Sequence, residues 1–172
     1  MGHVIAVAGK GGVGKTTLCG LLIQYLCENG KSPVLAVDAD ANSNLNEVLG
    51  VEAGPTLGQV REEIEQAGVD KDSPVPKGMT KGDYYDLMIM GRSQGSGCYC
   101  YVNSLVQAQI QKLQGNYPYV LVDNEAGMEH ISRGILPQMD TMIIVSDCSR
   151  RGVEAAGRIA SLVHECKMKP KT

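Results

Sequence analysis

The stretch best suited to chemistry is Gly9–Thr17, with the sequence GKGGVGKTT. It fits the pattern G-x-x-x-x-G-K-[ST], in which backbone N–H groups surround phosphate oxygens, the lysine reaches the β- and γ-phosphates, and the hydroxyl binds Mg²⁺. Glycine is needed because side chains would hold the backbone away from the anion. The pattern predicts a nucleotide site with Mg²⁺ on Thr16. Its contacts are expected from Gly11, Gly12, Val13, Gly14, Lys15, Thr16 and Thr17.

Carboxylates stand at the ends of two later apolar runs. Asp38 and Asp40 follow one run, and Asp123 follows another. Ligands of open α/β sheets bind along the carboxyl ends of the strands, so we expect these side chains to face the phosphate loop. Asp123, with Gly127 shortly after it, matches the acid that holds magnesium and the segment that senses the γ-phosphate. For Asp123 alone, an ordinary strand-end cap is the alternative.

A second feature with chemical potential is the pair Cys98 and Cys100, separated by one residue. Two thiolates at this spacing, between a glycine-rich turn and a helix, can both point at one thiophilic divalent ion such as Zn²⁺. A closed tetrahedral site needs four ligands, which a two-fold dimer would supply by contributing the pair twice. The alternative is that the pair consists of two unrelated thiols.

The rest of the chain must position these residues. Continuous apolar runs predict strands covered on both faces, near residues 4–8, 34–37, 85–90, 119–122 and 141–145. Helical patterns separate most of them, whereas residues 68–83 show no periodicity and predict irregular chain. This alternation predicts an α/β fold, a doubly wound, mostly parallel sheet flanked by helices, in a single domain over residues 1–172. P-loop domains usually continue into further strands, so we expect the chain to be C-terminally truncated.

Local signals predict how the helices are oriented and where they begin. Thr56 and Gln59 form an expected capping box at the start of one helix. In the first predicted helix, which should end near residues 29–30, apolar residues recur at helical spacing: Leu18, Leu21, Leu22, Tyr25 and Leu26. The last helix has an expected inward stripe of Val153, Ala156, Ile159, Ala160 and Val163.

The composition restricts the class of protein. There is no Phe or Trp, so the core must be aliphatic, and the net charge of −3 argues against a sequence-independent nucleic-acid binder. No run of 18 uncharged apolar residues and no signal-peptide pattern is visible, which predicts a cytoplasmic protein without a membrane partner. Six cysteines in such a chain favour free thiols or metal ligands over disulfides.

The loop GKGGVGKTT resembles the deviant Walker A motif of the MinD, ArsA and nitrogenase iron-protein class. The resemblance implies that Lys10 reaches across a nucleotide-dependent homodimer to the partner's phosphates. The same class carries a D-x-D after its second strand, which Asp38 and Asp40 match. By that resemblance Asp40 orients the attacking water, and Asp38 supports magnesium.

Three further segments, GRSQGSGCYCYVN, VDNEAGMEHISRG and VSDCSRRG, resemble the CooC-type carbon monoxide dehydrogenase maturation ATPases, including the relatives that serve acetyl-CoA synthase. The resemblance extends to about Cys166. It implies an ATPase that dimerises, binds Ni²⁺ or Zn²⁺ through Cys98 and Cys100, and assists nickel insertion into a client enzyme.

Other functions within the class stay open. A partitioning ATPase of the MinD or ParA kind shares the loop but needs an amphipathic membrane helix or a basic DNA-binding surface, and the sequence displays neither. An electron carrier like the nitrogenase iron protein needs a cysteine shortly after Asp123, and positions 124–135 contain none. An iron–sulfur scaffold ATPase typically has C-x-x-C, although thiolates in C-x-C also bind clusters.

Overall fold

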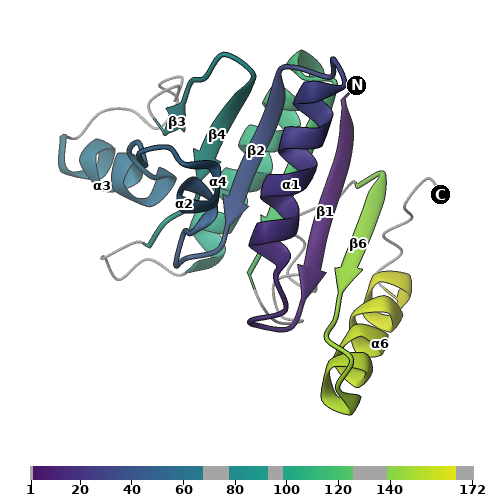
Figure 1. The fold of residues 1–172 in the computed structure, drawn as a ribbon. Helices are drawn as coiled ribbons and strands as arrows, with labels where there is room; N and C mark the ends of the chain where they lie inside the picture. Colours follow the sequence, from purple (N-terminus) through teal and green to yellow (C-terminus); the bar gives the residue numbers. More distant parts are fainter. Residues whose placement is uncertain (1, 68–77, 93–98, 126–138, 166–172) are drawn as a thin grey trace.

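Six strands form one sheet at the centre of the computed structural model, which describes residues 2–67, 78–92, 99–125 and 139–165 (Figure 1). The strands are β1 (His3–Gly9), β2 (Val34–Ala39), β3 (Met79–Thr80), β4 (Tyr85–Ile89), β5 (Tyr119–Asn124) and β6 (Thr141–Val145). Their spatial order is β3-β4-β2-β5-β1-β6, and only the short β3 is antiparallel to its neighbour. The predicted mostly parallel α/β sheet is confirmed.

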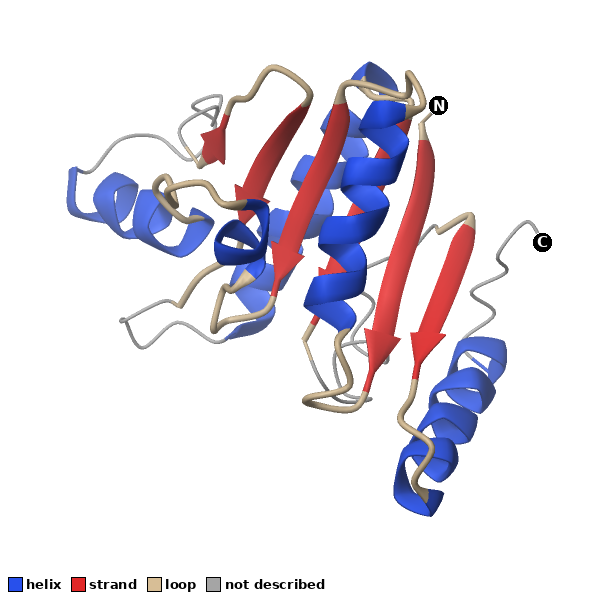
Figure 2. Cartoon of the chain, in the orientation of Figure 1, coloured by secondary structure: helices blue, strands red, loops and turns tan. Residues whose placement is uncertain are grey.

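Helices cover both faces of this sheet (Figure 2). The helices are α1 (Lys15–Glu28), α2 (Leu45–Leu49), α3 (Leu57–Ala67), α4 (Tyr99–Leu113) and α6 (Arg150–Glu165), with a 3₁₀ turn at Gln114–Asn116. Successive strand residues point to opposite faces. Val7 and Leu121 accordingly pack with Ile23 of α1, whereas the neighbouring Val120 packs with Val106 of α4.

The apolar pattern of α1 is buried only in part: Leu26 lies in the core and Leu18 and Leu22 pack against it. Cys19 and Ile23 are inside, whereas Leu21 is 60% exposed and Tyr25 is 62% exposed. The segment LCGLLIQYLC has apolar residues on nearly every side, so periodicity alone did not select the inner face. The close packing of α2 on Gly20 selects the inner face, because a Cβ on Gly20 would lie 2.4 Å from Val48 Cγ1.

The last helix is also oriented differently from the prediction. Ile159 and Val163 are buried as expected, and they pack on Ala8 of β1. Val153 is 60% exposed, and Ala160 is exposed as well. Within the described residues, α6 packs mainly on β1 and β6, the two strands at one edge of the sheet. Its buried stripe is therefore narrower than its apolar pattern.

Two local expectations for the chain between β2 and β5 have clear outcomes. The capping box is confirmed, because the Thr56 N–H donates to Gln59 Oε1 at 2.9 Å and the Gln59 N–H donates to Thr56 Oγ1 at 3.2 Å. Part of the stretch predicted to be irregular, Met79–Thr80, instead forms β3. A two-residue strand is too short for its alternation to show in sequence.

Asp86 is a carboxylate within the buried strand β4, and it is 6% exposed. Lys81 Nζ donates to its Oδ2 at 2.6 Å, the Tyr117 hydroxyl donates to the same oxygen, and the Gly82 N–H donates to Oδ1 at 3.3 Å. Buried charges are tolerated when they are paired and hydrogen-bonded. This cluster therefore stabilises the start of β4, at the end of the sheet opposite the strand termini that carry Asp38 and Asp123.

Candidate functional site

The loop between β1 and α1 lies at the carboxyl ends of the parallel strands (Figure 1). Gly14, the residue before α1, has φ 89°, a left-handed conformation that favours glycine. Gly9 is needed for a different reason, because a Cβ there would lie 2.3 Å from the carbonyl oxygen of Val145 in β6. The glycines therefore permit a tight turn that leads directly into a helix N-terminus, where backbone N–H groups and the helix dipole favour anions.

Lys15 begins α1 and is only 8% exposed. Its Nζ donates to the carbonyl oxygen of Lys10 at 3.3 Å, so the side chain folds back over the loop. An ammonium group is thereby held within the turn that the sequence predicted to surround phosphate. This placement suits a residue that neutralises the charge of phosphate oxygens.

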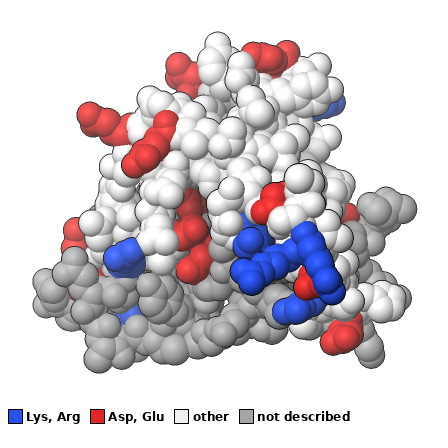
Figure 3. Space-filling model, turned by 60° about the horizontal axis from the view of Figure 1, so that its bottom comes forward, with Lys and Arg blue, Asp and Glu red and all other residues white. Residues whose placement is uncertain are grey.

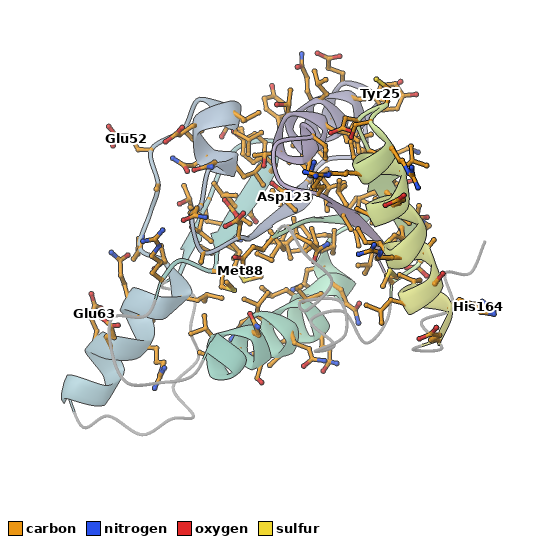
Figure 4. All side chains as sticks on the ribbon, turned by 90° about the horizontal axis from the view of Figure 1, so that it is seen from below. Tyr25, Glu52, Glu63, Met88, Asp123 and His164 are labelled. Carbon is orange, nitrogen blue, oxygen red and sulfur yellow. The ribbon has the colours of Figure 1, made fainter. Side chains whose placement is uncertain are left out.

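Asp123, at the end of β5, lies at the centre of the edge seen from below (Figure 4). It is 2% exposed and pairs in register with Asp38 of β2. Burial raises the pKa of its carboxyl group, while hydrogen bonding to the Thr16 hydroxyl and the charge of Lys15 lower it. Its Oδ1 accepts no hydrogen bond from any described residue. A buried carboxylate oxygen beside a threonine hydroxyl fits the oxygen ligands that Mg²⁺ prefers.

Two residues beside Asp123 have contacts that the sequence reasoning missed. Cys19 of α1 is fully buried, and its thiol faces Asp123. Burial, and to a lesser extent the Asp123 carboxylate, raises the pKa of this thiol. The Asn124 amide donates to the Val7 carbonyl oxygen at 3.0 Å, which ties the end of β5 to the strand that precedes the phosphate loop. Neither contact has a signal in local sequence, because each joins residues more than 100 positions apart.

Asp38 organises the loop that follows β2. Its Oδ1 accepts the N–H of Asp40 at 3.0 Å, and its Oδ2 accepts the N–H of Leu45 at 3.0 Å. Burial raises its pKa to about 6, although these two hydrogen bonds act in the opposite direction. Asp38 is therefore a structural anchor for the turn that holds Asp40. The sequence had suggested only a role in supporting magnesium.

Asp40 itself is half-buried at the same edge, and its Oδ1 accepts the N–H of Asn42 at 2.8 Å. The Asn42 side-chain oxygen in turn accepts a hydrogen bond from Arg92 Nη2. Arg92 was not singled out by sequence, since it lies 50 positions from Asn42. The loop after β2 and the chain after β4 are thus joined at the edge that carries the phosphate loop.

Lys10 projects from the phosphate loop toward the start of α6. Its Nζ lies 4.0 Å from Asp147 Oδ2, and both side chains are nearly half exposed. Hydrogen bonds from Ser149, followed by the charge of Lys10, lower the pKa of Asp147. Arg150 and Arg151 are exposed nearby, and Figure 3 shows basic side chains gathered on this edge beside acidic ones. Lys10 is accessible to a partner.

Neither the side chains of the predicted thiol pair nor Gly127, the residue predicted to sense the γ-phosphate, has a described position. Cys98 and Gly127 lie outside the described residues, and Cys100 belongs to the first turn of α4 without a described side chain. Within the described ranges, no group of three or more His, Cys, Asp or Glu side chains is arranged to hold a metal ion. No helix in those ranges is long and apolar enough to cross a membrane.

Comparison with known proteins identifies related sequences and folds. A family described as AAA domain, AAA_31, matches residues 2–172. An uncharacterized ATP-binding protein of Methanocaldococcus jannaschii is 46% identical over 98% of this chain and 71% of its own length. The carbon monoxide dehydrogenase accessory protein CooC of Rhodospirillum rubrum is 31% identical over 96% of this chain and 70% of its own length.

Among solved structures, the septum site-determining protein MinD of Pyrococcus horikoshii, complexed with Mg-ADP, has a TM-score of 0.73 and 23% sequence identity. The match covers 98% of this chain and 67% of that one. These shares mean that the present chain is shorter than its relatives. The family match spans the phosphate loop together with Asp38, Asp40 and Asp123. The chain therefore belongs to the AAA domain family AAA_31 of P-loop NTPases.

Proposed function

We propose that this protein binds Mg²⁺ with ATP or ADP at the carboxyl edge of the sheet and hydrolyses ATP there. The observation that carries the proposal is the buried Asp123 carboxylate, whose Oδ1 accepts no hydrogen bond from the described residues and which faces Thr16 and Lys15 at the start of α1. A structural role for Asp123 alone would favour a fully hydrogen-bonded carboxylate. The arrangement therefore favours a cation at this position.

Each residue in this proposal has a separate task. Lys15 neutralises the β- and γ-phosphates, and the N–H groups between Gly11 and Thr17 surround their oxygens. Thr16 and Asp123 would hold Mg²⁺, with Asp38 supporting the metal indirectly and Gly127 sensing the γ-phosphate. When bound, the metal neutralises charge that develops on the phosphate oxygens. Asp40 orients the attacking water by accepting its hydrogen bond.

The first test is the substitution Lys15→Ala, measured as the rate of phosphate release from ATP. We expect turnover to fall by about a hundredfold or more, because a charge that stabilises the transition state is removed. Lys31→Ala is the matched control, since Lys31 is an exposed lysine beyond the far end of α1. Equal turnover in the Lys15 variant and the wild type would remove the ATPase proposal.

We further propose that the ATPase acts as a homodimer, binds Ni²⁺ or Zn²⁺ through Cys98 and Cys100, and assists nickel insertion into carbon monoxide dehydrogenase or acetyl-CoA synthase. The support is the C-x-C pair in the sequence, together with 31% identity to the carbon monoxide dehydrogenase accessory protein CooC. Two copies of the pair supply the four soft ligands that a tetrahedral ion requires. In this scheme the ion is cargo, and ATP binding alters the spacing of the two pairs.

The second test is a titration of Ni²⁺ and Zn²⁺ into the apo protein, with and without nucleotide, while the mass in solution is recorded. We expect about one ion per dimer, because four thiolates close one site. Cys98→Ala and Cys100→Ala should each abolish tight binding, whereas Cys148→Ala, which removes an exposed thiol elsewhere, should not. Tight binding that persists in both C-x-C variants would rule out the pair as the site.

A partitioning ATPase is the alternative favoured by the fold, because the MinD structure matches nearly the whole chain. That function requires nucleotide-dependent binding to a membrane or to DNA. Co-sedimentation with anionic vesicles and gel shifts with duplex DNA, each with and without Mg-ATP, separate the two proposals. An iron–sulfur scaffold would instead show the visible absorption of a cluster after anaerobic preparation.

A further inference from the structure

One tertiary contact joins two loops at the nucleotide edge. Arg92 Nη2 donates a hydrogen bond to Asn42 Oδ1. Asn42 belongs to the loop after β2, and Arg92 follows β4 by three residues. Both side chains are exposed, so the contact does not serve to fill the core. A guanidinium donor and an amide acceptor form a charge-assisted hydrogen bond.

On one side, the contact involves Asn42, which lies two positions after Asp40. The Asn42 N–H donates to Asp40 Oδ1 at 2.8 Å, and the Asp40 N–H donates to Asp38 Oδ1 at 3.0 Å. The carboxylate of Asp40 therefore has its orientation set by the residue that Arg92 holds. The Asn42 backbone N–H binds Asp40, and the Asn42 side-chain oxygen binds Arg92. Asn42 therefore couples the position of the Arg92 side chain to that of the Asp40 carboxylate.

On the other side, the chain that carries Arg92 is anchored. The Met90 N–H donates to the Asp38 carbonyl oxygen at 2.8 Å, and the Gly58 N–H at the start of α3 donates to the Met90 carbonyl oxygen at 3.1 Å. Gly91 has φ 67°, and a Cβ there would lie 2.4 Å from Thr56 side-chain atoms. Arg92 thus extends toward Asn42 from a turn fixed by β2, α3 and Thr56.

We propose that Arg92 is a positioning residue for ATP hydrolysis, acting through Asn42 on Asp40. This inference rests on the proposed function, in which Asp40 orients the attacking water. It adds a residue outside the phosphate loop that sets the orientation of the Asp40 carboxylate.

The kinetic test compares Arg92→Ala, Asn42→Ala, the double variant and Arg92→Lys. We expect kcat to fall by about three- to tenfold in each alanine variant, with the KM for ATP within about twofold, because an exposed hydrogen bond has a modest effect and acts on the water rather than on ATP. The double variant should lose no more than either single variant, because both act through one contact. Arg92→Lys should recover part of the rate.

Arg158→Ala is the matched control, since Arg158 is an exposed arginine on α6 away from this edge. A raised KM with unchanged kcat, additive losses in the double variant, or equal kinetics for Arg92→Ala and the control would overturn the positioning role. Absence of ATP hydrolysis in the wild type would instead remove the proposed function. The two failures are therefore distinguishable.

Discussion

At the residue scale, the two buried aspartates have different local environments although they are partners in neighbouring strands. Asp38 has both carboxylate oxygens hydrogen-bonded to the backbone of its own loop, whereas one oxygen of Asp123 accepts no hydrogen bond from the described residues. A buried polar atom without a partner costs free energy unless a ligand satisfies it. Asp38 therefore shapes the loop, and Asp123 is better suited to bind a cation.

The raised pKa of Asp38 predicts how stability depends on pH. Its pKa is raised from 3.8 to about 6, so between these values the folded state binds more protons than the unfolded state. Stability contributed by the protonated group is thus fully present below about pH 4 and is lost as the pH rises through about 6. The change is on the order of 3 kcal/mol.

Urea unfolding at several pH values checks this expectation. The free energy of unfolding of the wild type should fall more steeply over this pH range than that of Asp38→Asn, in which the titrating group is absent. Asp38→Asn also loses one acceptor for a backbone N–H, so the comparison concerns the slope with pH and not the absolute stability. Parallel profiles for the two proteins would contradict the assignment.

At the scale of elements, α1 connects the phosphate loop to the core. Its N-terminus directly follows the phosphate loop, and its inner face packs Cys19, Ile23 and Leu26 against the sheet. The exposed side of the helix also has apolar residues, including Leu21 and Tyr25. Ile23 is buried and Leu21 is exposed, although they are two aliphatic residues only two positions apart. This pair allows a matched test of the observed orientation of α1.

Ile23→Ala should lower the free energy of unfolding by about 2–4 kcal/mol, because a fully buried side chain is replaced by a cavity. Leu21→Ala should change it by no more than about 0.5 kcal/mol, since that side chain is mainly exposed. Urea titration followed by circular dichroism measures both. Equal losses in the two variants would mean that α1 is rotated from the orientation described here.

At the scale of the whole molecule, the carboxyl edge of the sheet gathers the phosphate loop, the aspartates and an exposed Lys10. In the single chain, Lys10 lies 4.0 Å from Asp147, and exposed pairs of this kind contribute little to stability. Little free energy therefore holds Lys10 against Asp147, and in the proposed dimer the lysine would be free to reach the partner's phosphates. This accessibility is consistent with the dimer that we propose.

Lys10→Ala should abolish dimerisation driven by a non-hydrolysable ATP analogue, because the charge that bridges to the partner's phosphates is removed. Binding of the nucleotide by the monomer should persist, since Lys15 and the loop backbone are unchanged. Sedimentation velocity with a fluorescent nucleotide measures mass and occupancy together, and Lys31→Ala is the control. A nucleotide-loaded dimer of Lys10→Ala would contradict the role across the dimer.

The amino-acid sequence by itself determined the phosphate loop, the order of the main elements, the mostly parallel sheet and the strand-end positions of Asp38, Asp40 and Asp123. These features follow from local rules. Glycines occur where the backbone turns tightly, apolar runs form strands that are covered on both faces, and parallel strands share one carboxyl edge. Even the capping box of α3 was predicted, because its two partners are three residues apart.

Only the tertiary structure decided which side of α1 is buried, that the Cys19 thiol faces Asp123, that Asp38 anchors its own loop, and that Arg92 holds Asn42. Each of these depends on which surfaces meet across the sheet or across long sequence separations, and apolar periodicity cannot choose among several apolar sides of one helix. The sequence thus predicted the residues of the phosphate loop, whereas packing determined how the loop carrying Asp40 is held beside them.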